Sequence, residues 1–233
     1  MKSSPLLFRA EMVCAILREI DPKTQTRRTE GLDAVNAAPD DWNPLFIIPA
    51  IGLQNKKPTV QFLNSRTGLI VDCISKKGMP GDQIWVREDY YQFGHWEPVA
   101  NVKTKRGRQK WKFCPESDRI TFDPPKGFYG GRRNQRPGEF KWFKRLARFM
   151  PRKYSRITLE LTDVRVERLN SISEADAKAE GVADTFDARI ASKFVGGNPG
   201  PAQMEYWALW ESINGPGSWA KNPWVWRYSF KML

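Results

Sequence analysis

The chain has 233 residues, 40% of them hydrophobic, which is enough for a substantial core. Its net charge is +12, and no apolar run approaches the ~20 residues of a transmembrane helix, so the composition argues against a membrane protein. Arg9 and Glu11 interrupt the apolar PLLF near the N-terminus before a signal peptide could form, and we therefore expect a cytoplasmic protein.

The first part of the chain alternates helix and strand signals, which indicates an α+β fold. Apolar residues at helical spacing predict a helix over residues 10–20, followed by the polar loop PKTQTRRTE. TVQFL and TGLIVDCI flank NSR and predict a hairpin. MPGDQIWVRED predicts a Pro-Gly turn that leads into a strand.

The last part of the chain continues this pattern. RITLELTDVRVERL alternates as a long strand, and Ser173 with Asp176 forms a capping-box pattern for a helix that Gly181 ends. A further helix is marked by Tyr206, Leu209, Trp210 and Ile213 and ends at NGPG. WVWRYSFKML predicts a final strand with Trp224, Trp226, Tyr228 and Phe230 on one face.

Nearly all the positive charge lies in residues 103–156. This segment has 18 Lys and Arg against 4 Asp and Glu, a net of +14, and the remainder has 20 against 22, a net of −2. Aromatic residues interleave with the cations, a composition that suits phosphate contacts and base stacking and predicts RNA or single-stranded DNA as partner. The expected contacts are Trp111, Arg132, Arg133, Lys141, Trp142, Lys144, Arg145, Arg148, Arg152, Lys153 and Arg156. The alternative is a solvated basic insertion that keeps the protein in solution.

The cysteines and the single histidine show no metal-site spacing. Cys14, Cys73 and Cys114 are odd in number, widely separated and without a C-x-x-C pair, which argues against a disulfide framework or a zinc site. His95 alone cannot supply a multi-histidine centre. We therefore predict no metal and no cofactor, and no pattern indicates an oligomeric state.

Lys23, Thr26 and Glu180 combine features that suggest chemistry. Glu180 falls in the last turn of its helix, where the negative end of the helix dipole disfavours a carboxylate by ~0.3–1 kcal/mol. A lysine made neutral by desolvation could take the proton of the Thr26 hydroxyl and produce a nucleophile without histidine. The plainer interpretation is that Lys23 and Thr26 are solvated loop residues and that Glu180 is an ordinary surface residue.

The order of these segments resembles the ASCH-domain family of the PUA-like superfamily, especially the larger members encoded by bacteriophages and prophages. The matching pieces are the apolar helix, KTQTRR, PGDQIWVRE, SRITLELTDVRVERLNSISEADAKAEGV and WVWRYSFKML, within residues 5–30, 79–90 and 150–233. The resemblance implies one domain over residues 1–233, a curved β-barrel flanked by helices with a cleft for a nucleotide or RNA. Residues 91–149 would be a long basic, aromatic-rich insertion in that domain, and the protein would act in the cytoplasm of a bacterial host.

The resemblance also implies a reaction. Small bacterial members of the family include an amidohydrolase that removes the acetyl group from N4-acetylcytidine with a lysine, a threonine and a glutamate. Its K-T-x-T-x-R motif falls on KTQTRR, so Lys23 would be the base and Thr26 the nucleophile, while Glu180 would orient Lys23 or pass a proton to the leaving amine.

The neighbours of these three residues would contact the substrate, namely Thr24, Arg27 and Arg28. A nearby Glu180 carboxylate raises the pKa of a lysine, so either burial or the arginines must offset it, or Lys23 stabilises the oxyanion as a cation.

Three functional hypotheses follow from these observations. The first is a hydrolase of the amidohydrolase type that acts on a modified cytidine-type nucleoside or nucleotide. The second is a non-catalytic module that binds RNA or DNA or reads a modified base in the same cleft. The third is a ribonuclease in which Lys23 and the arginines stabilise the transition state.

Overall fold

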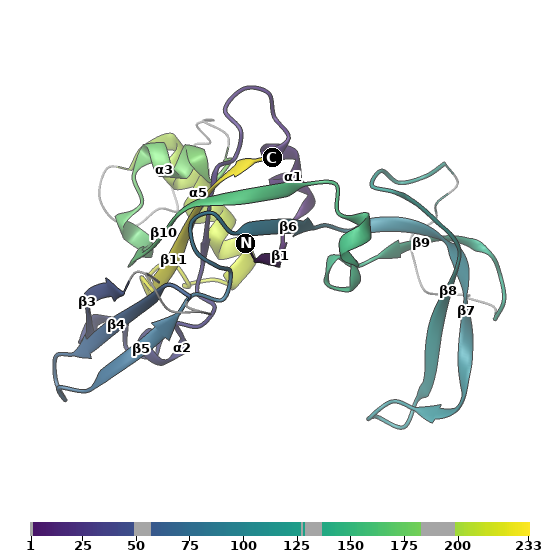
Figure 1. Ribbon diagram of the computed structural model, residues 1–233, viewed down its shortest axis with the longest axis horizontal. Helices are drawn as coiled ribbons and strands as arrows, with labels where there is room; N and C mark the ends of the chain where they lie inside the picture. The colour runs from purple at the N-terminus through teal and green to yellow at the C-terminus, as the bar shows by residue number, and fades with distance from the viewer. Residues whose placement is uncertain (1, 49–56, 127, 129–136, 183–198) are drawn as a thin grey trace. The chain divides into compact units, whose positions relative to one another are not determined.

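The computed structural model describes residues 2–48, 57–126, 128, 137–182 and 199–233 (Figure 1). The chain divides into two compact units: unit 1 contains Met1–Leu6, Glu11–Val86 and Ile157–Leu233, and unit 2 contains Leu7–Ala10 and Arg87–Arg156. The α+β class is confirmed, because the described residues form three sheets of strands and few helices. Over the described residues none of the sheets is a closed barrel, and none of the helices is long and apolar enough to cross a membrane.

Unit 1 is built on a five-stranded sheet. Its strand order is β1 (Ser3–Leu7), β6 (Gln83–Arg87), β10 (Thr158–Arg168), β11 (Trp224–Met232) and β2 (Gln25–Arg28). β10 pairs antiparallel with β6 and β11, and β11 pairs antiparallel with β2. The predicted strands at PGDQIWVRE, at RITLELTDVRVERL and at the C-terminal WVWRYSFKML are thereby confirmed.

Strand β11 has one face buried from Trp224 to Phe230, and its other face is buried at Val225. The predicted aromatic face is confirmed, because Trp224, Trp226, Tyr228 and Phe230 are all buried. On the other face, Val225 packs in a second apolar cluster with Tyr206 and Trp210 of α5 (Pro201–Asn214). Figure 1 shows α5 and α3 (Glu174–Ala179) beside β10 and β11. β11 therefore lies at the centre of the unit 1 core.

The short helices begin and end at residues with clear physical roles. Ser173 caps α3 by accepting a hydrogen bond from the backbone N–H of Asp176, and Gly181 follows it at φ +84°, as the sequence predicts. The N-terminal helix α1 (Ala10–Ile16) is shorter than predicted. The carbonyl of Ala15 accepts from the backbone N–H of Lys23 at 2.9 Å, because the chain folds back there instead of continuing the helix. Helix α2 covers Asp33–Asn36.

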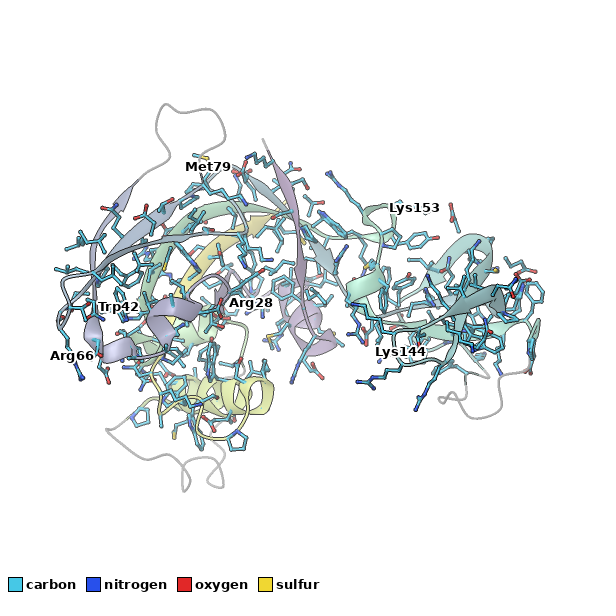
Figure 2. The ribbon with its side chains drawn as sticks, turned by 90° about the horizontal axis from the view of Figure 1, so that it is seen from below. Arg28, Trp42, Arg66, Met79, Lys144 and Lys153 are labelled. Carbon is cyan, nitrogen blue, oxygen red and sulfur yellow. The ribbon has the colours of Figure 1, made fainter. Side chains whose placement is uncertain are left out.

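The second sheet of unit 1 has the order β3 (Trp42–Ile48), β4 (Thr59–Asn64) and β5 (Ile70–Ile74). The predicted hairpin is confirmed, because β4 and β5 pair antiparallel. Arg66 in the turn forms an ion pair with Asp41 at 2.9 Å, and both Arg66 and Trp42 are labelled in Figure 2. Within the described residues, 3₁₀ helices lie at Pro39–Asp41, Ala147–Phe149, Arg152–Tyr154 and Leu169–Ser171.

Unit 2 contains a three-stranded antiparallel sheet in the order β8 (Gln109–Thr121), β7 (Tyr90–Lys103) and β9 (Lys141–Arg145). β9 pairs only with the Tyr90–Gly94 end of β7. β7 and β8 stay paired as far as Lys103 and Gln109, so they continue as a two-stranded ribbon beyond β9 (Figure 1). Residues 91–149, the segment expected as an insertion, lie wholly in this unit.

We expect Gly181→Ala to destabilise unit 1 more than Gly81→Ala. Both glycines have a positive φ, +84° and +87°, so each substitution carries a backbone cost of about 1–2 kcal/mol. A Cβ at Gly181 would also lie 2.7 Å from the Cβ of Ala15 and 2.8 Å from the Cβ of Lys23, whereas nothing lies within 4 Å at Gly81. Crowding of this kind adds about 1–3 kcal/mol. Urea unfolding measures the difference, and equal losses would show that the contact of Gly181 with α1 and Lys23 is unimportant.

Candidate functional site

Part of the polar run after α1, Gln25–Arg28, is the edge strand β2, so the expectation of a solvated loop is wrong for these residues and for the buried Lys23. β2 pairs with β11, with Thr26 opposite Tyr228 and Arg27 opposite Arg227. Lys23, Thr26 and Arg27 are each only 3% exposed. Burial of the charged Lys23 and Arg27 is tolerated only where charged partners are present, and these partners come from β10 and from the C-terminal end of α3, more than a hundred residues later in the chain.

Lys23 and Glu180 form a buried ion pair. The Lys23 Nζ lies 2.7 Å from the Glu180 Oε2, and it also donates to the backbone carbonyl of Glu180. The backbone N–H of Thr24 donates to the carbonyl of Ala179 at 2.8 Å. The ammonium group therefore satisfies a free carbonyl at the C-terminus of α3, where the helix dipole favours a cation. This arrangement accounts for a carboxylate at an otherwise unfavourable helix position.

Arg27, on strand β2, also contacts Glu180. Its Nη1 lies 3.0 Å from the Glu180 Oε1, and its Nη2 lies 2.6 Å from Glu167 and 3.6 Å from Asp176. Arg227 on β11 lies 3.7 Å from Glu167 and 3.5 Å from Asp176. We call this set the buried charge cluster; its members are Lys23, Arg27, Glu167, Asp176, Glu180 and Arg227. It balances three cations with three carboxylates.

The environment of Lys23 makes its charged form less favourable than in water. Burial lowers the pKa of Lys23, and the positive charges of Arg28 and Arg27 lower it further, while Glu180 raises it. The net shift is downward, with burial as the largest cause. Burial together with Glu180 raises the pKa of Tyr206 well above its usual value, so this phenol stays protonated, with its oxygen 3.5 Å from the Glu180 Oε1.

Thr26 lies on the opposite face of β2 from Arg27. The register places Thr26 and Arg28 on the face of Tyr228 and Trp226, because directly paired residues share a face. Among the residues that the structure describes, both hydrogen bonds of the Lys23 ammonium go to Glu180, and none joins it to Thr26. Arg28 is labelled in Figure 2, and burial lowers its pKa. Thr24 is exposed.

The predicted nucleic-acid contacts of unit 2 prove to be largely occupied by partners within the unit. Ion pairs join Lys141 to Glu139, Lys144 to Asp89, Lys153 to Asp118 and Arg156 to Glu88, at 2.6–3.2 Å. Lys144 and Lys153 are labelled in Figure 2. The Arg145 guanidinium lies over the rings of Phe113 and Trp96, 4.2 and 5.2 Å from their centroids. These contacts reduce the positive charge that this part of the segment can offer to a phosphate.

Of the remaining predicted nucleic-acid contacts, some contact aromatic rings and others are exposed. Arg132 and Arg133 lie outside the described residues. Trp142 packs edge-to-face on Phe93 at 5.6 Å, and the Arg148 guanidinium lies 5.2 Å from the ring of Phe149. Arg152 is exposed, and Trp111 is 43% exposed on β8.

A set of cations that the sequence did not single out lies on the far part of the β7–β8 ribbon. We call residues 98–113 the distal hairpin; its exposed cations are Lys103, Lys105, Arg106, Arg108, Lys110 and Lys112. It contains no acidic residue, and within the described part of the chain none of these six cations has an ion pair. The basic run KTKRGRQKWK is visible in the sequence. Which cations of residues 103–156 form ion pairs depends on strand register, which the sequence does not show.

The fold and the site define an α+β protein with a buried charge cluster in unit 1 and a basic, aromatic hairpin in unit 2. Comparison of the chain with protein-family models, with curated proteins and with solved structures finds no match. The functional argument therefore rests on the residue pattern and on the geometry.

We expect Lys23→Met to reduce the free energy of unfolding by about 3–5 kcal/mol, because it leaves the buried Glu180 without its closest cation. Glu180→Gln should cost a similar amount, and the double variant less than the sum of the two. Lys231→Met is the matched control, because Lys231 pairs with Glu160 at 3.4 Å on the exposed surface of the same unit and should change stability by about 0–1 kcal/mol. Urea denaturation measures all four variants; a Lys23→Met loss no larger than that of the control would contradict the proposed role of the pair.

Proposed function

We propose that this chain is an ASCH-type hydrolase with a PUA-like architecture, acting on an N4-acylated cytidine-type nucleoside or nucleotide. The observation that carries the proposal is the 2.7 Å contact between Lys23 and Glu180, residues separated by 157 positions in sequence. Thr26, the proposed nucleophile, is buried on strand β2, three residues after Lys23.

Lys23 is suited to act as a general base. Its pKa is lowered by burial, so a larger fraction of its amine is neutral near neutral pH than for a solvated lysine. Glu180 opposes this shift, but its charge is shared with Arg27, whose Nη1 lies 3.0 Å from the second carboxylate oxygen. In this arrangement Glu180 orients the amine, and Arg27 is a positioning residue for Glu180 instead of a substrate contact.

The proposed reaction proceeds through an acyl-enzyme. The Lys23 Nζ exchanges a hydrogen bond to Glu180 for one to Thr26 and accepts the hydroxyl proton as the Thr26 Oγ1 bonds to the acetyl carbon. The bond from that carbon to the cytosine nitrogen breaks, and the amine leaves with a proton returned by Lys23 or passed through Glu180. Water then hydrolyses the threonyl ester. Arg28, on the face of Thr26, is the cation that would contact the substrate or the oxyanion.

The test is release of cytidine from N4-acetylcytidine, followed by chromatography, with other N4-acylated cytosines in parallel. We expect the wild type to turn over one of these substrates and Thr26→Val to lower kcat/KM by at least ~10²-fold, because it removes the hydroxyl and keeps the volume. Thr26→Ser should retain part of the activity.

Thr162→Val, at an exposed position of β10, is the matched control and should leave kcat/KM unchanged. The proposal fails if no N4-acylated substrate yields cytidine. Full activity in Thr26→Val would instead reject Thr26 as the nucleophile while leaving the reaction class open.

A second candidate function is nucleic-acid binding by unit 2, which the distal hairpin favours. Its exposed, unpaired cations flank Trp111, an aromatic side chain accessible to an unpaired base. Cations that follow a ribbon together with an exposed ring are typical of proteins that bind single strands. We propose that this hairpin, more than the cations paired elsewhere in unit 2, provides the contact to RNA or single-stranded DNA.

We expect the triple variant Lys105→Glu, Arg106→Glu and Arg108→Glu to weaken binding to single-stranded RNA and to make the log–log salt slope shallower by about 2, near 0.7 for each lost phosphate contact. Trp111→Ala should cost about 1–3 kcal/mol of binding free energy with little change in slope.

The control reverses three exposed lysines of unit 1, Lys57, Lys76 and Lys221, and so makes the same change in net charge. Fluorescence anisotropy across a salt series measures all the variants. An equal effect of the control would indicate a nonspecific response to net charge, and no affinity of the wild type for RNA or DNA at low salt would reject the second function.

A further inference from the structure

Three potential metal ligands meet at the base of the distal hairpin. The register of β7 and β8 pairs His95 directly with Cys114, and Glu97 lies two residues after His95, so all three side chains share one face. The His95 Nε2 lies 2.8 Å from the Glu97 Oε1, and the Cys114 Sγ lies 3.4 Å from the Glu97 Oε2. One ligand atom from each residue lies within 4.8 Å of the other two.

The backbone is adapted to this close approach. A register shift lies between Gln92 and Gly94, and a Cβ at Gly94 would overlap the carbonyl oxygen of Cys114. Glycine therefore allows the two strands to approach at the point where His95 and Cys114 face each other. The His95 ring packs against Phe140, with the ring centroids 4.3 Å apart, which restricts its orientation.

The chemistry of these ligands selects the kind of ion. Imidazole nitrogen and thiolate sulfur favour zinc and similar transition metals over magnesium or calcium, which prefer oxygen. With zinc bond lengths of about 2.0–2.3 Å, ligand atoms around a tetrahedral ion are separated by roughly 3.4–3.6 Å. The separations of 2.8 and 3.4 Å are close to these values, so small side-chain movements would admit an ion.

We propose that His95, Glu97 and Cys114 form a three-ligand site for a divalent transition metal ion of the zinc type, with a fourth position open to water or another ligand. Binding replaces the thiol proton, which is released to solvent, by a metal–sulfur bond. Because the ligands come from both strands, the ion cross-links the base of the distal hairpin. Lys112 lies directly opposite Glu97 on the neighbouring strand, so its positive charge repels the bound ion and lowers the affinity of the site. The site is independent of the proposed hydrolase.

The test is titration of the full chain, reduced and freed of metal with a chelator, with Co(II) alone. We expect a thiolate-to-Co(II) charge-transfer band together with the visible bands of a four-coordinate ion, at one equivalent, and loss of both on addition of Zn(II). Cys114→Ser should abolish the charge-transfer band. His95→Phe, which keeps a ring against Phe140, should weaken Co(II) binding by more than about tenfold.

Cys14→Ser is the matched control, because Cys14 is an exposed free thiol in unit 1 and its loss should leave the spectrum unchanged. Circular dichroism checks that each variant is folded. The proposal is overturned if the wild type gives no charge-transfer band with excess Co(II), or if the band persists in Cys114→Ser. The three residues would then form a hydrogen-bonded group without a metal.

Discussion

The buried ion pair between Lys23 and Glu180 is the interaction on which the rest of unit 1 depends. Moving each charge out of water costs several kcal/mol, so the pair is tolerable only because Arg27, Glu167 and Asp176 complete its partners. The cluster adds charged contacts to the backbone hydrogen bonds that join the edge strand β2 to β11 and Thr24 to the end of α3. It therefore specifies where β2 lies as well as contributing to stability.

The same cluster links stability to chemistry. A lysine kept from water and close to two arginines has a lowered pKa, which is the property a general base requires and also a cost to the folded state. Gly181 supports this arrangement from the other side, because a side chain there would displace both α1 and Lys23. The lack of a side chain at Gly181 thus leaves room for Lys23 beside α1.

Unit 2 divides its positive charge into two classes. Cations on β9 and near it, such as Lys144, Arg145 and Arg156, pair with carboxylates or lie over aromatic rings within the unit. Those of the distal hairpin have neither kind of partner among the described residues and remain in solvent. The net charge of +14 in residues 103–156 is therefore a poor measure of the charge available to a partner. The available charge depends on which cations are paired within the unit.

Local sequence patterns correctly predicted the α+β class, the β4–β5 hairpin, the strands β6, β10 and β11, and the capped helix α3, because alternation, capping residues and turn glycines act over a few residues. The sequence also singled out Lys23, Thr26 and Glu180 as a catalytic group, with Thr24, Arg27 and Arg28 as substrate contacts. Three features came only from the folded structure: Gln25–Arg28 form an edge strand with Thr26 and Arg27 buried, some cations of unit 2 are paired, and His95 lies opposite Cys114. Each of these depends on register and on partners distant in the chain, and local patterns carry no information about either.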